Sequence, residues 1–333
     1  MVRLARRAAV AVADAPLVRG TLQRLAARDP GRPDQLAVLT YHRVAEPDDR
    51  LFPGLISATP TEFDEQMAWL AGRHRVITLA QLLERREDGE PLPAHSVLIT
   101  FDDAYADFAA HAWPVLQRHG LPATLFVPTA YVDDPRRAFW WDRIHRVLTA
   151  APAAITATPL VELDLRSPAS RSRSARRLRE ALKVLPHAAA MARVDEVVDA
   201  LGGDGASGCV LSWTDLQGLV GQGLEVGVHT RTHPLLDQLS PERLDDEIAG
   251  ARDDIERHLG RPATTIAYPN GNHSPAVIEA ASRAGMRLGF TTRRGTNDLR
   301  DPDWLTLRRI NVGRSTSPAL LAAQLHRWFR LWP

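Results

Sequence analysis

The stretch "LEVGVHTRTHP", residues 224–234, joins a short apolar run to two histidines four positions apart. A His-x-x-x-His pair by itself suggests a metal site on a helix. A proline follows the second histidine, however, and the residue before a proline is disfavoured in the right-handed helical region. The stretch therefore predicts a buried strand that ends in a loop carrying His229 and His233.

Six other short runs rich in Val, Ile, Leu, Thr or Phe also end in polar residues, as buried parallel strands do. These runs are 37–42, 96–103, 123–128, 264–271, 289–292 and 305–312. Helical segments lie between them, among them 240–260, where Ser240 is the expected N-cap and Gly260 the expected C-cap. Alternating strands and helices predict a parallel sheet or a β/α barrel, whose chemistry gathers at the C-terminal strand ends.

Composition and charge are those of a globular protein, and one segment interrupts the alternation of strands and helices. The 333 residues are 44% hydrophobic and 24% charged, with a net charge of +1 that gives no reason to expect nucleic acid as a partner. Residues 135–211, rich in Ala, Arg and Ser, are predicted to form a mostly helical insertion between the third and fourth strands. Its arginine run could bind an anionic polymer, but a solvated helix face is the favoured interpretation.

The two chain ends are basic and amphipathic. Residues 1–35 are interpreted as a helical leader and not as an export signal, because the apolar stretch is short and Asp14 ends it. Residues 314–333 predict an amphipathic helix that packs on the barrel, with docking on a membrane or a synthesis complex as the alternative. The expected location is cytoplasmic or peripheral at a membrane. The apolar positions of this helix are Leu325, Trp328, Phe329 and Trp332.

Two adjacent carboxylates, Asp102 and Asp103, follow the strand at 96–103. Side chains alternate along a strand, so one carboxylate is expected on a metal and the other free to act as a base. A strand-end turn or a helix N-cap is the alternative for this pair. One carboxylate and two imidazoles, with a position left for water, are typical of a catalytic zinc site.

Three motifs together resemble the polysaccharide deacetylase family, the NodB-homology or carbohydrate esterase 4 type. They are "TFDD" (100–103), "HTRTHP" (229–234) and "AYPNG" (267–271), and the resemblance covers roughly residues 36–313. It implies a distorted β/α barrel of about seven parallel strands and one divalent metal ion, commonly zinc. It also implies hydrolysis of N-acetyl, sometimes O-acetyl, groups on sugar polymers.

Carried over by position, the resemblance implies a role for each motif residue. Asp102 matches the general base, and Asp103, His229 and His233 match the metal ligands. Asp102 would take a proton from a water whose pKa the metal lowers. A backbone N–H of the "YPNG" turn, that of Asn270, would stabilise the oxyanion.

The chain departs from the family where an arginine orients the base, because Ala267 stands at that position. Arg308 and Arg309 of the last strand are the possible replacements, and alternation places one of them inward. Arg309 is favoured because it shares a face with Leu307. We expect it to form a bidentate pair with Asp102.

Two further departures concern Ala104 and the catalytic acid. Ala104 replaces the usual glycine, which is compatible with the fold if its φ angle is negative. The late motif that carries a histidine acid is not recognisable, so His42 and His273 are candidates, with a structural or substrate-contacting role as the alternative for each.

Several residues are expected to contact the substrate. "FWWD" at 139–142 offers Trp140 or Trp141 as a platform for a sugar ring, if the insertion overhangs the site; filling the core beneath the insertion is the alternative. The other expected contacts are His42, Tyr268 and Pro269.

The sequence therefore predicts a metal-dependent hydrolase that removes N-acetyl, or else O-acetyl, groups from an envelope polysaccharide or a lipid-linked glycan. Two alternatives stay open. One is a non-catalytic glycan-binding member of the same fold, and the other is a hydrolase of a non-glycan amide.

Overall fold

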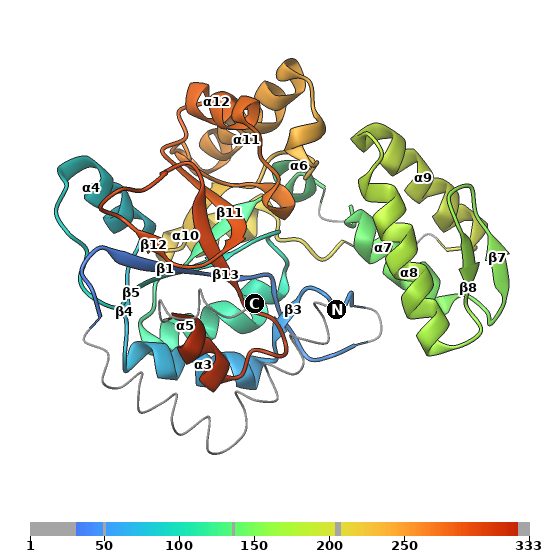
Figure 1. Cartoon of the computed structure of the whole chain (residues 1–333), viewed down its shortest axis with the longest axis horizontal. Coiled ribbons are helices and arrows are strands. Elements are labelled where there is room, and N and C mark those ends of the chain that lie inside the picture. The colour runs from blue at the N-terminus through green and yellow to red at the C-terminus, as the bar shows by residue number, and fades with distance from the viewer. Residues whose placement is uncertain (1–30, 49–50, 135–136, 204–207, 326–333) are drawn as a thin grey trace.

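Two lobes of unequal size make up the protein, which is described here from a computed structural model (Figure 1). The structure describes residues 31–48, 51–134, 137–203 and 208–325. The larger lobe is a barrel surrounded by helices, and the smaller one is the insertion. No helix in these ranges combines the length and the apolar character needed to cross a bilayer.

The barrel is closed by seven parallel strands, as predicted. Closure follows because the first strand pairs with both the last strand and β5. In order around the barrel the strands are β1 (Gln35–Tyr41), β13 (Leu307–Asn311), β11 (Leu288–Arg294), β10 (Thr265–Ala267), β9 (Glu225–Val228), β6 (Thr124–Val127) and β5 (Ser96–Phe101). Two short strands extend the sheet, β12 (Asn297–Asp298) antiparallel to β1 and β4 (Arg75–Val76) parallel to β5.

Side chains alternate between the inside and the outside of the barrel. Leu36 and Val38 of β1 belong to an inner cluster that includes Phe126 and Phe290, whose ring centroids lie 5.4 Å apart although their strands are not neighbours. The intervening residues of β1 pack instead in the larger core against the outer helices. Leu307 lies in the inner cluster, so the inward face of β13 is the face that carries Arg309.

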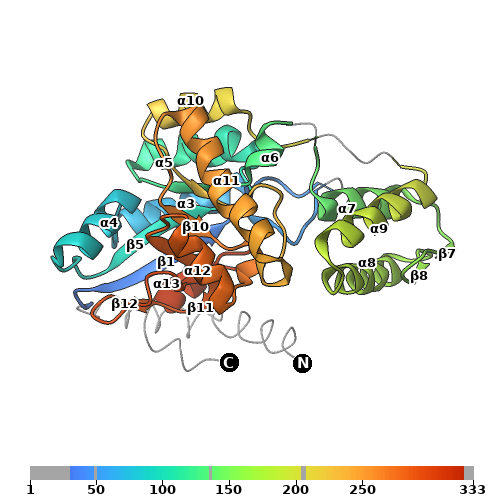
Figure 2. The same cartoon turned by 90° about the horizontal axis from the view of Figure 1, so that it is seen from above.

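Helices surround the outside of the barrel (Figures 1 and 2). They are α3 (Pro60–Ala71), α4 (Leu79–Asp88), the π-helix η1 (Phe108–Ala112), α5 (Trp113–His119), α6 (Thr129–Val132), α10 (Trp213–Gly221), α11 (Pro241–Leu259), α12 (Pro275–Arg283) and α13 (Pro318–Leu325). Two 3-10 turns, η2 (Leu236–Gln238) and η3 (Pro269–Gly271), and a small sheet of β2 (Arg43–Val44) and β3 (Ile56–Ala58) complete this lobe. Helix α11 begins after Ser240 and ends at Gly260 as predicted, although the Ser240 side chain makes no capping hydrogen bond.

The insertion folds around a core of its own. It consists of α7 (Trp140–Ala150), β7 (Ile155–Ala157), β8 (Glu162–Asp164), α8 (Pro168–Lys183) and α9 (His187–Ala200). A mostly helical insertion was predicted from the sequence, and the antiparallel hairpin of β7 and β8 was not. Leu163, Leu178 and Val194 are fully buried in a cluster separate from those of the barrel. From above, the lobe stands beside the barrel with α7 nearest to it (Figure 2).

The chain ends are described only in part. The leader expected at residues 1–35 lies outside the described residues up to position 30, as do Trp328, Phe329 and Trp332. The described part of the C-terminal helix, α13, is buried on the barrel and adjoins α3.

Candidate metal centre and active site

The predicted site residues meet at one end of the barrel. Asp102 and Asp103 follow β5, His229 follows β9 and Asn270 follows β10, while Arg309 lies within β13. Because these strands are parallel, their carboxyl ends lie at the same end of the barrel. The positions of these residues at the ends of the apolar runs predicted that they would meet there.

Asp103, His229 and His233 form a compact group whose potential ligand atoms all lie within 4.8 Å of one another. The Oδ1 atom of Asp103 is 3.4 Å from His229 Nε2 and 3.3 Å from His233 Nε2. His229 Nδ1 lies 2.7 Å from the carbonyl oxygen of Ala267, to which it donates, and this fixes Nε2 as the nitrogen with the free lone pair.

These three residues fit a metal ion. Asp103 Oδ1 is buried and makes no hydrogen bond within the described residues, although two imidazole nitrogens face it. Buried oxygen and nitrogen lone pairs that converge in this way repel one another unless a cation lies between them. The donor set of two imidazoles and one carboxylate is one that zinc and related divalent ions take.

The backbone turns sharply at the two carboxylates. Asp103 has φ 72° and Ala104 has φ 52°, both in the left-handed region, so the condition of a negative φ under which alanine fits easily at position 104 is not met. Such a conformation costs about 1–2 kcal/mol per non-glycine residue. The turn lets two adjacent side chains reach the same cavity, because it breaks the alternation of the strand. Ala104 is fully buried and its carbonyl oxygen accepts from Leu211 N at 2.9 Å.

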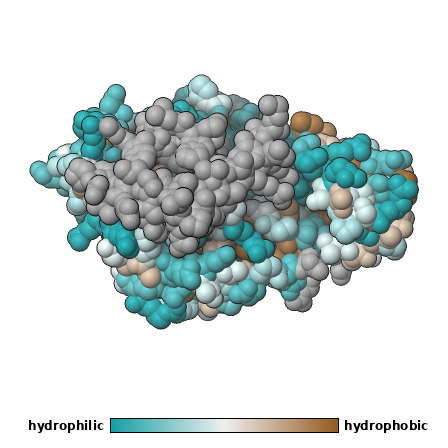
Figure 3. All heavy atoms as spheres, turned by 60° about the horizontal axis from the view of Figure 1, so that its bottom comes forward, coloured by the Kyte–Doolittle hydropathy of each residue, from teal (hydrophilic) through white to brown (hydrophobic). Residues whose placement is uncertain are grey.

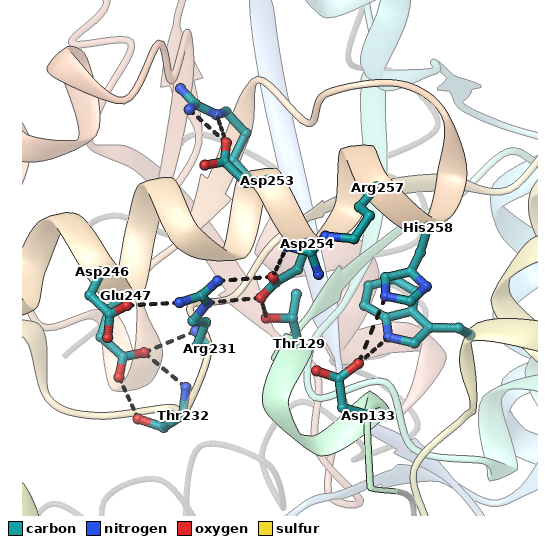
Figure 4. A network of polar contacts seen from close by, with 12 residues as sticks. Thr129, Asp133, Arg231, Thr232, Asp246, Glu247, Asp253, Asp254, Arg257 and His258 are labelled. Atoms are coloured by element: carbon teal, nitrogen blue, oxygen red, sulfur yellow. Dashed lines mark hydrogen bonds and ion pairs between the residues drawn. The ribbon is translucent and has the colours of Figure 1, made fainter.

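A network of charges holds the histidine loop, which is also strained at Thr230 (φ 67°) and His233 (φ 57°). Arg231 donates from Nε to Asp254 at 2.8 Å and from Nη1 to Asp246 at 2.7 Å (Figure 4). All of these acceptors lie on α11. The loop is therefore anchored to that helix between its two histidines.

Glu247 of the same helix completes this anchor. It is fully buried and accepts from the backbone N–H groups of Arg231 and Thr232 at 2.9 and 2.8 Å (Figure 4). This network was not predicted from the sequence. Its only signal was the acidic content of 240–260, which is equally typical of a solvated helix face.

Arg309 forms the bidentate pair with Asp102 that the sequence analysis expected. Its Nη1 and Nη2 atoms each lie 2.8 Å from a carboxylate oxygen of Asp102, and its Nε donates to Thr291 O at 2.9 Å. Both partners are buried. Burial raises the pKa of the Asp102 carboxyl, but the Arg309 guanidinium holds it below its ordinary value, so the carboxylate is ionised. Arg308 points away and donates to Arg294 O.

Asn270 lies in the turn η3 with φ 55°, and its neighbours fix it on two sides. Lys183 Nζ from the insertion donates to Asn270 Oδ1 at 2.9 Å, and Thr292 Oγ1 donates to its carbonyl oxygen at 3.0 Å. Backbone N–H groups at the start of such a turn have no partner within it. The turn thus offers a donor next to the metal group.

Gly271 is expected to be indispensable to this turn. A Cβ there would lie 2.1 Å from Thr292 Oγ1 and 2.6 Å from Thr292 N, at φ 77°. Gly285 has the same φ, and a Cβ there would meet nothing within 4 Å. We expect Gly271→Ala to lower the free energy of unfolding by about 1–3 kcal/mol more than Gly285→Ala, measured by urea denaturation. Equal losses in the two variants would show that the contact with Thr292 is not restrictive.

Two of the expected substrate contacts are wrong. The Tyr268 side chain is fully buried and its hydroxyl donates to Leu305 O at 2.9 Å, and Pro269 is also buried. Neither lines the cavity at the site. The Tyr268 hydroxyl instead links the end of β10 to the segment before β13. The position of Tyr268 in the sequence did not indicate this buried role.

Both tryptophans of α7 line the cavity. The contacts of Trp141, however, are those of a packed side chain and not those of a platform for a sugar ring. Trp141 stacks on Phe139 with ring centroids 4.6 Å apart, and its edge contacts His233 at 4.9 Å. Its indole N–H donates to Tyr105 Oη at 2.9 Å. Trp141 is therefore mainly a support for His233, whereas the more exposed Trp140 also lines the cavity.

Three histidines outside the metal group are candidates for the catalytic acid. His42 lines the cavity close to both carboxylates, and burial lowers its pKa. His273 stacks on Tyr268 and bonds to Gly271 O through Nδ1, and it does not line the cavity. His187 of α9, which the sequence analysis missed, does line it. No signal in the sequence connects His187 with the barrel.

The cavity itself has a volume of about 480 Å³ and lies between the barrel and the insertion. The barrel contributes the metal group, His42 and Asn270. The insertion contributes residues of α7, α8 and α9. The insertion therefore forms one wall of the cavity at the site.

Comparisons with known proteins agree with this geometry. The family model for polysaccharide deacetylase matches residues 89–289. YxkH of Bacillus subtilis (strain 168), a protein assigned to the polysaccharide deacetylases, is 21% identical over 296 residues, which are 88% of this chain and 77% of that protein. The poly-beta-1,6-N-acetyl-D-glucosamine N-deacetylase of Escherichia coli (strain K12) is 31% identical over 114 residues, 34% of this chain and 17% of that protein.

Solved structures show the same fold. The Streptococcus pyogenes deacetylase PplD in complex with acetate aligns with a TM-score of 0.60 and 21% identity, over 89% of this chain and all of that chain. IcaB from Ammonifex degensii aligns with a TM-score of 0.58 and 23% identity, over 88% of this chain and 97% of that chain. With its closed barrel and its matched motifs, the chain belongs to the polysaccharide deacetylase family and is a hydrolase of that type.

Proposed function

We propose that this protein removes N-acetyl groups from a polysaccharide or a lipid-linked glycan, using one divalent metal ion, zinc, held by Asp103, His229 and His233. The observation that carries the proposal is the ionised Asp102, paired with Arg309 and adjacent to the three ligands in one cavity. A free carboxylate beside a metal group is the combination that hydrolysis of an amide requires.

The metal, when bound, supplies Lewis acidity and lowers the pKa of a water molecule. Asp102 accepts the proton of that water, a role worth about 10²–10⁴ in rate. Arg309 keeps the carboxylate ionised and directed toward the cavity, and it prevents Asp102 from turning onto the ion. The N–H of Asn270 donates to the developing oxyanion.

His42 is the residue we propose to protonate the leaving amine or to contact the sugar beside it. It lines the cavity and lies close to Asp102 and Asp103, and burial lowers its pKa despite the charges of these two carboxylates. Trp140, rather than Trp141, is the aromatic surface that we propose for stacking on a sugar ring.

The relatives support an N-acetyl sugar as the substrate. The Escherichia coli protein that matches 114 residues of this chain is named as an N-deacetylase of poly-beta-1,6-N-acetyl-D-glucosamine. The pair of Asp102 and Arg309 favours this function over that of a non-catalytic glycan-binding protein, because it keeps a proton acceptor ionised inside the cavity.

Acetate release tests the proposal. The purified protein, treated with a chelator and reloaded with zinc, is expected to release acetate from β-1,4- and β-1,6-linked N-acetylglucosamine oligosaccharides or from peptidoglycan fragments. Asp102→Asn should reduce the rate at least about 100-fold, whereas Asp301→Asn, at an exposed aspartate, should leave it unchanged. Zinc-loaded protein that releases no acetate from any of these glycans would contradict the proposal.

A further inference from the structure

One face of helix α8 lines the cavity with positive charge. Arg176, Arg179 and Lys183 follow one another at spacings of three and four, so they lie on the same side of the helix, and all three line the cavity. The other arginines of the helix do not. Arg171 donates to the carbonyl oxygens of Leu148 and Ala151 within the lobe.

Among the described residues that line this wall of the cavity, cations outnumber anions. The charge of Asp102 is balanced by Arg309, and Asp103 faces two imidazoles. Glu180 is the one acidic residue from the described insertion that lines the cavity, and it lies 3.9 Å from Arg176. The described residues of helix α8 on this wall are three cations and one anion, an arrangement that favours an anionic group in the cavity.

The positive face begins at the reacting end of the cavity. Lys183 Nζ donates to Asn270 Oδ1 at 2.9 Å, and Gln238 Nε2 donates to Lys183 O at 3.0 Å. These bonds connect the end of α8 directly to the barrel. Arg179 and Arg176 lie one and two turns further along the helix, away from Asn270.

The other surfaces of the cavity suit a sugar ring. Phe52, Leu55, Trp140, Leu185 and Met191 line it with apolar atoms, and the Arg179 guanidinium lies 4.8 Å from the centre of the Phe52 ring. On the face that Figure 3 shows, the insertion is mostly hydrophilic, with hydrophobic residues in small patches. Charged and apolar side chains therefore share the walls of the cavity.

We propose that this face, Arg176, Arg179 and Lys183, is a subsite for the carboxylate or phosphate of an acidic glycan. The anionic group would be carried on or next to the N-acetyl sugar that is hydrolysed. Planar guanidinium groups bind carboxylates and phosphates in the bidentate manner that the two arginines allow. This inference rests on the proposed deacetylase function and names the class of its substrate.

Binding to matched charged and neutral sugars tests the subsite. The first pair is a hexasaccharide of alternating N-acetylglucosamine and glucuronic acid and its carboxyl methyl ester. The second is N-acetylglucosamine 1-phosphate and N-acetylglucosamine, so the two pairs distinguish carboxylate from phosphate. By calorimetry at low salt, the zinc-loaded protein should bind the charged member of at least one pair about tenfold more tightly, and the difference should shrink at high salt.

Two double variants separate the subsite from non-specific charge. Arg176→Gln with Arg179→Gln should abolish the preference for the charged sugar. Arg173→Gln with Arg177→Gln makes the same change in charge at exposed positions of the same helix that do not line the cavity, and it should retain the preference. Equal affinity for charged and neutral sugars in the natural protein, or equal losses in the two double variants, would overturn the subsite. The control also excludes simple binding of the anion to the metal.

Lys183 gives a second measurement on the unaltered protein, because it is the sole lysine of the chain. Acylation of its amine, followed by mass spectrometry, should slow several-fold in the presence of the charged sugar and not of the neutral one. Absence of protection would contradict the subsite. Acetate release without any charge preference would refute the subsite alone, whereas charge-dependent binding without acetate release from any glycan would refute the deacetylase function alone.

Discussion

Replacing His229 or His233 with alanine is expected to abolish stoichiometric binding of a divalent metal while leaving a folded protein. Each substitution removes one of three donors that lie within 4.8 Å of one another. The two donors that remain cannot hold the ion tightly, because sites of this type need three protein ligands. Elemental analysis of the purified variants measures the metal content directly. Activity should fall at least about 100-fold, because the loss of a residue that only supports a metal ligand already lowers activity by up to about 100-fold.

Thermal unfolding provides a readout that does not depend on turnover. A ligand that binds only the folded state at 100 times its Kd stabilises that state by about 2.7 kcal/mol. The natural protein should therefore unfold at a higher temperature when zinc is added, and the two variants should show no such rise. His111→Ala, at an exposed histidine, is the matched control and should retain both metal and thermal shift. Unchanged metal content in His229→Ala and His233→Ala would refute the assignment.

The two variants are also expected to differ in stability. His229 is buried and donates to Ala267 O, so its loss leaves a buried carbonyl oxygen without that partner, at a cost of about 1–3 kcal/mol. His233 is less buried and contacts Trp141 and Phe139 at its edge. Its removal deletes contact area without that unsatisfied oxygen, so His229→Ala should be the less stable variant.

The barrel could be predicted because its strands are nearly continuous apolar runs. All seven runs found in the sequence are strands of the closed barrel, and the polar residue that ends each run marks the edge where the site lies. That rule gave the place of the site, the three motifs and the family resemblance gave the roles of its residues, and Arg309 came from alternation along the run at 305–312. Its partner could be named because an inward arginine at that edge needs a carboxylate, and Asp102 was free.

What could not be predicted depends on contacts between distant parts of the chain. Lys183 and Asn270 are 87 positions apart and meet because the insertion packs beside the barrel. The same packing brings His187 to the cavity. No periodic pattern records such contacts. The positive φ angles at Asp103 and Ala104 were missed for another reason, since aspartate and alanine give no local signal of the kind that glycine gives.

Replacing Arg309 with methionine is expected to cost both stability and activity. The substitution leaves the buried Asp102 carboxylate without its bidentate partner, and breaking such a pair destabilises a protein by about 3–5 kcal/mol. Lysine cannot take its place, because one ammonium cannot bind both carboxylate oxygens and Thr291 O in the geometry of a guanidinium. Urea denaturation and acetate release of Arg309→Met and Arg309→Lys measure the two effects.

The loss of stability should depend on pH in a direction that identifies its cause. In the natural protein the pKa of Asp102 is held below its ordinary value, so the pair stabilises the fold above that ordinary value and loses this effect as the pH falls. Without Arg309, burial raises the pKa of Asp102. The folded variant can then be protonated at Asp102 in mild acid, and its deficit relative to the natural protein should be smaller at pH 4 than at pH 7.

A double variant separates the structural role of the pair from its chemical role. Arg309→Met with Asp102→Asn removes both charges, and replacing both members of a buried ion pair is often close to neutral. We expect the double variant to recover most of the stability that Arg309→Met loses, while it releases no more acetate than Asp102→Asn alone. If Arg309→Met kept full activity despite its lower stability, Arg309 would only balance a buried charge. Loss of activity in a variant still folded at the assay temperature would instead show that the guanidinium keeps Asp102 ionised and directed at the water, which is the positioning role proposed for it.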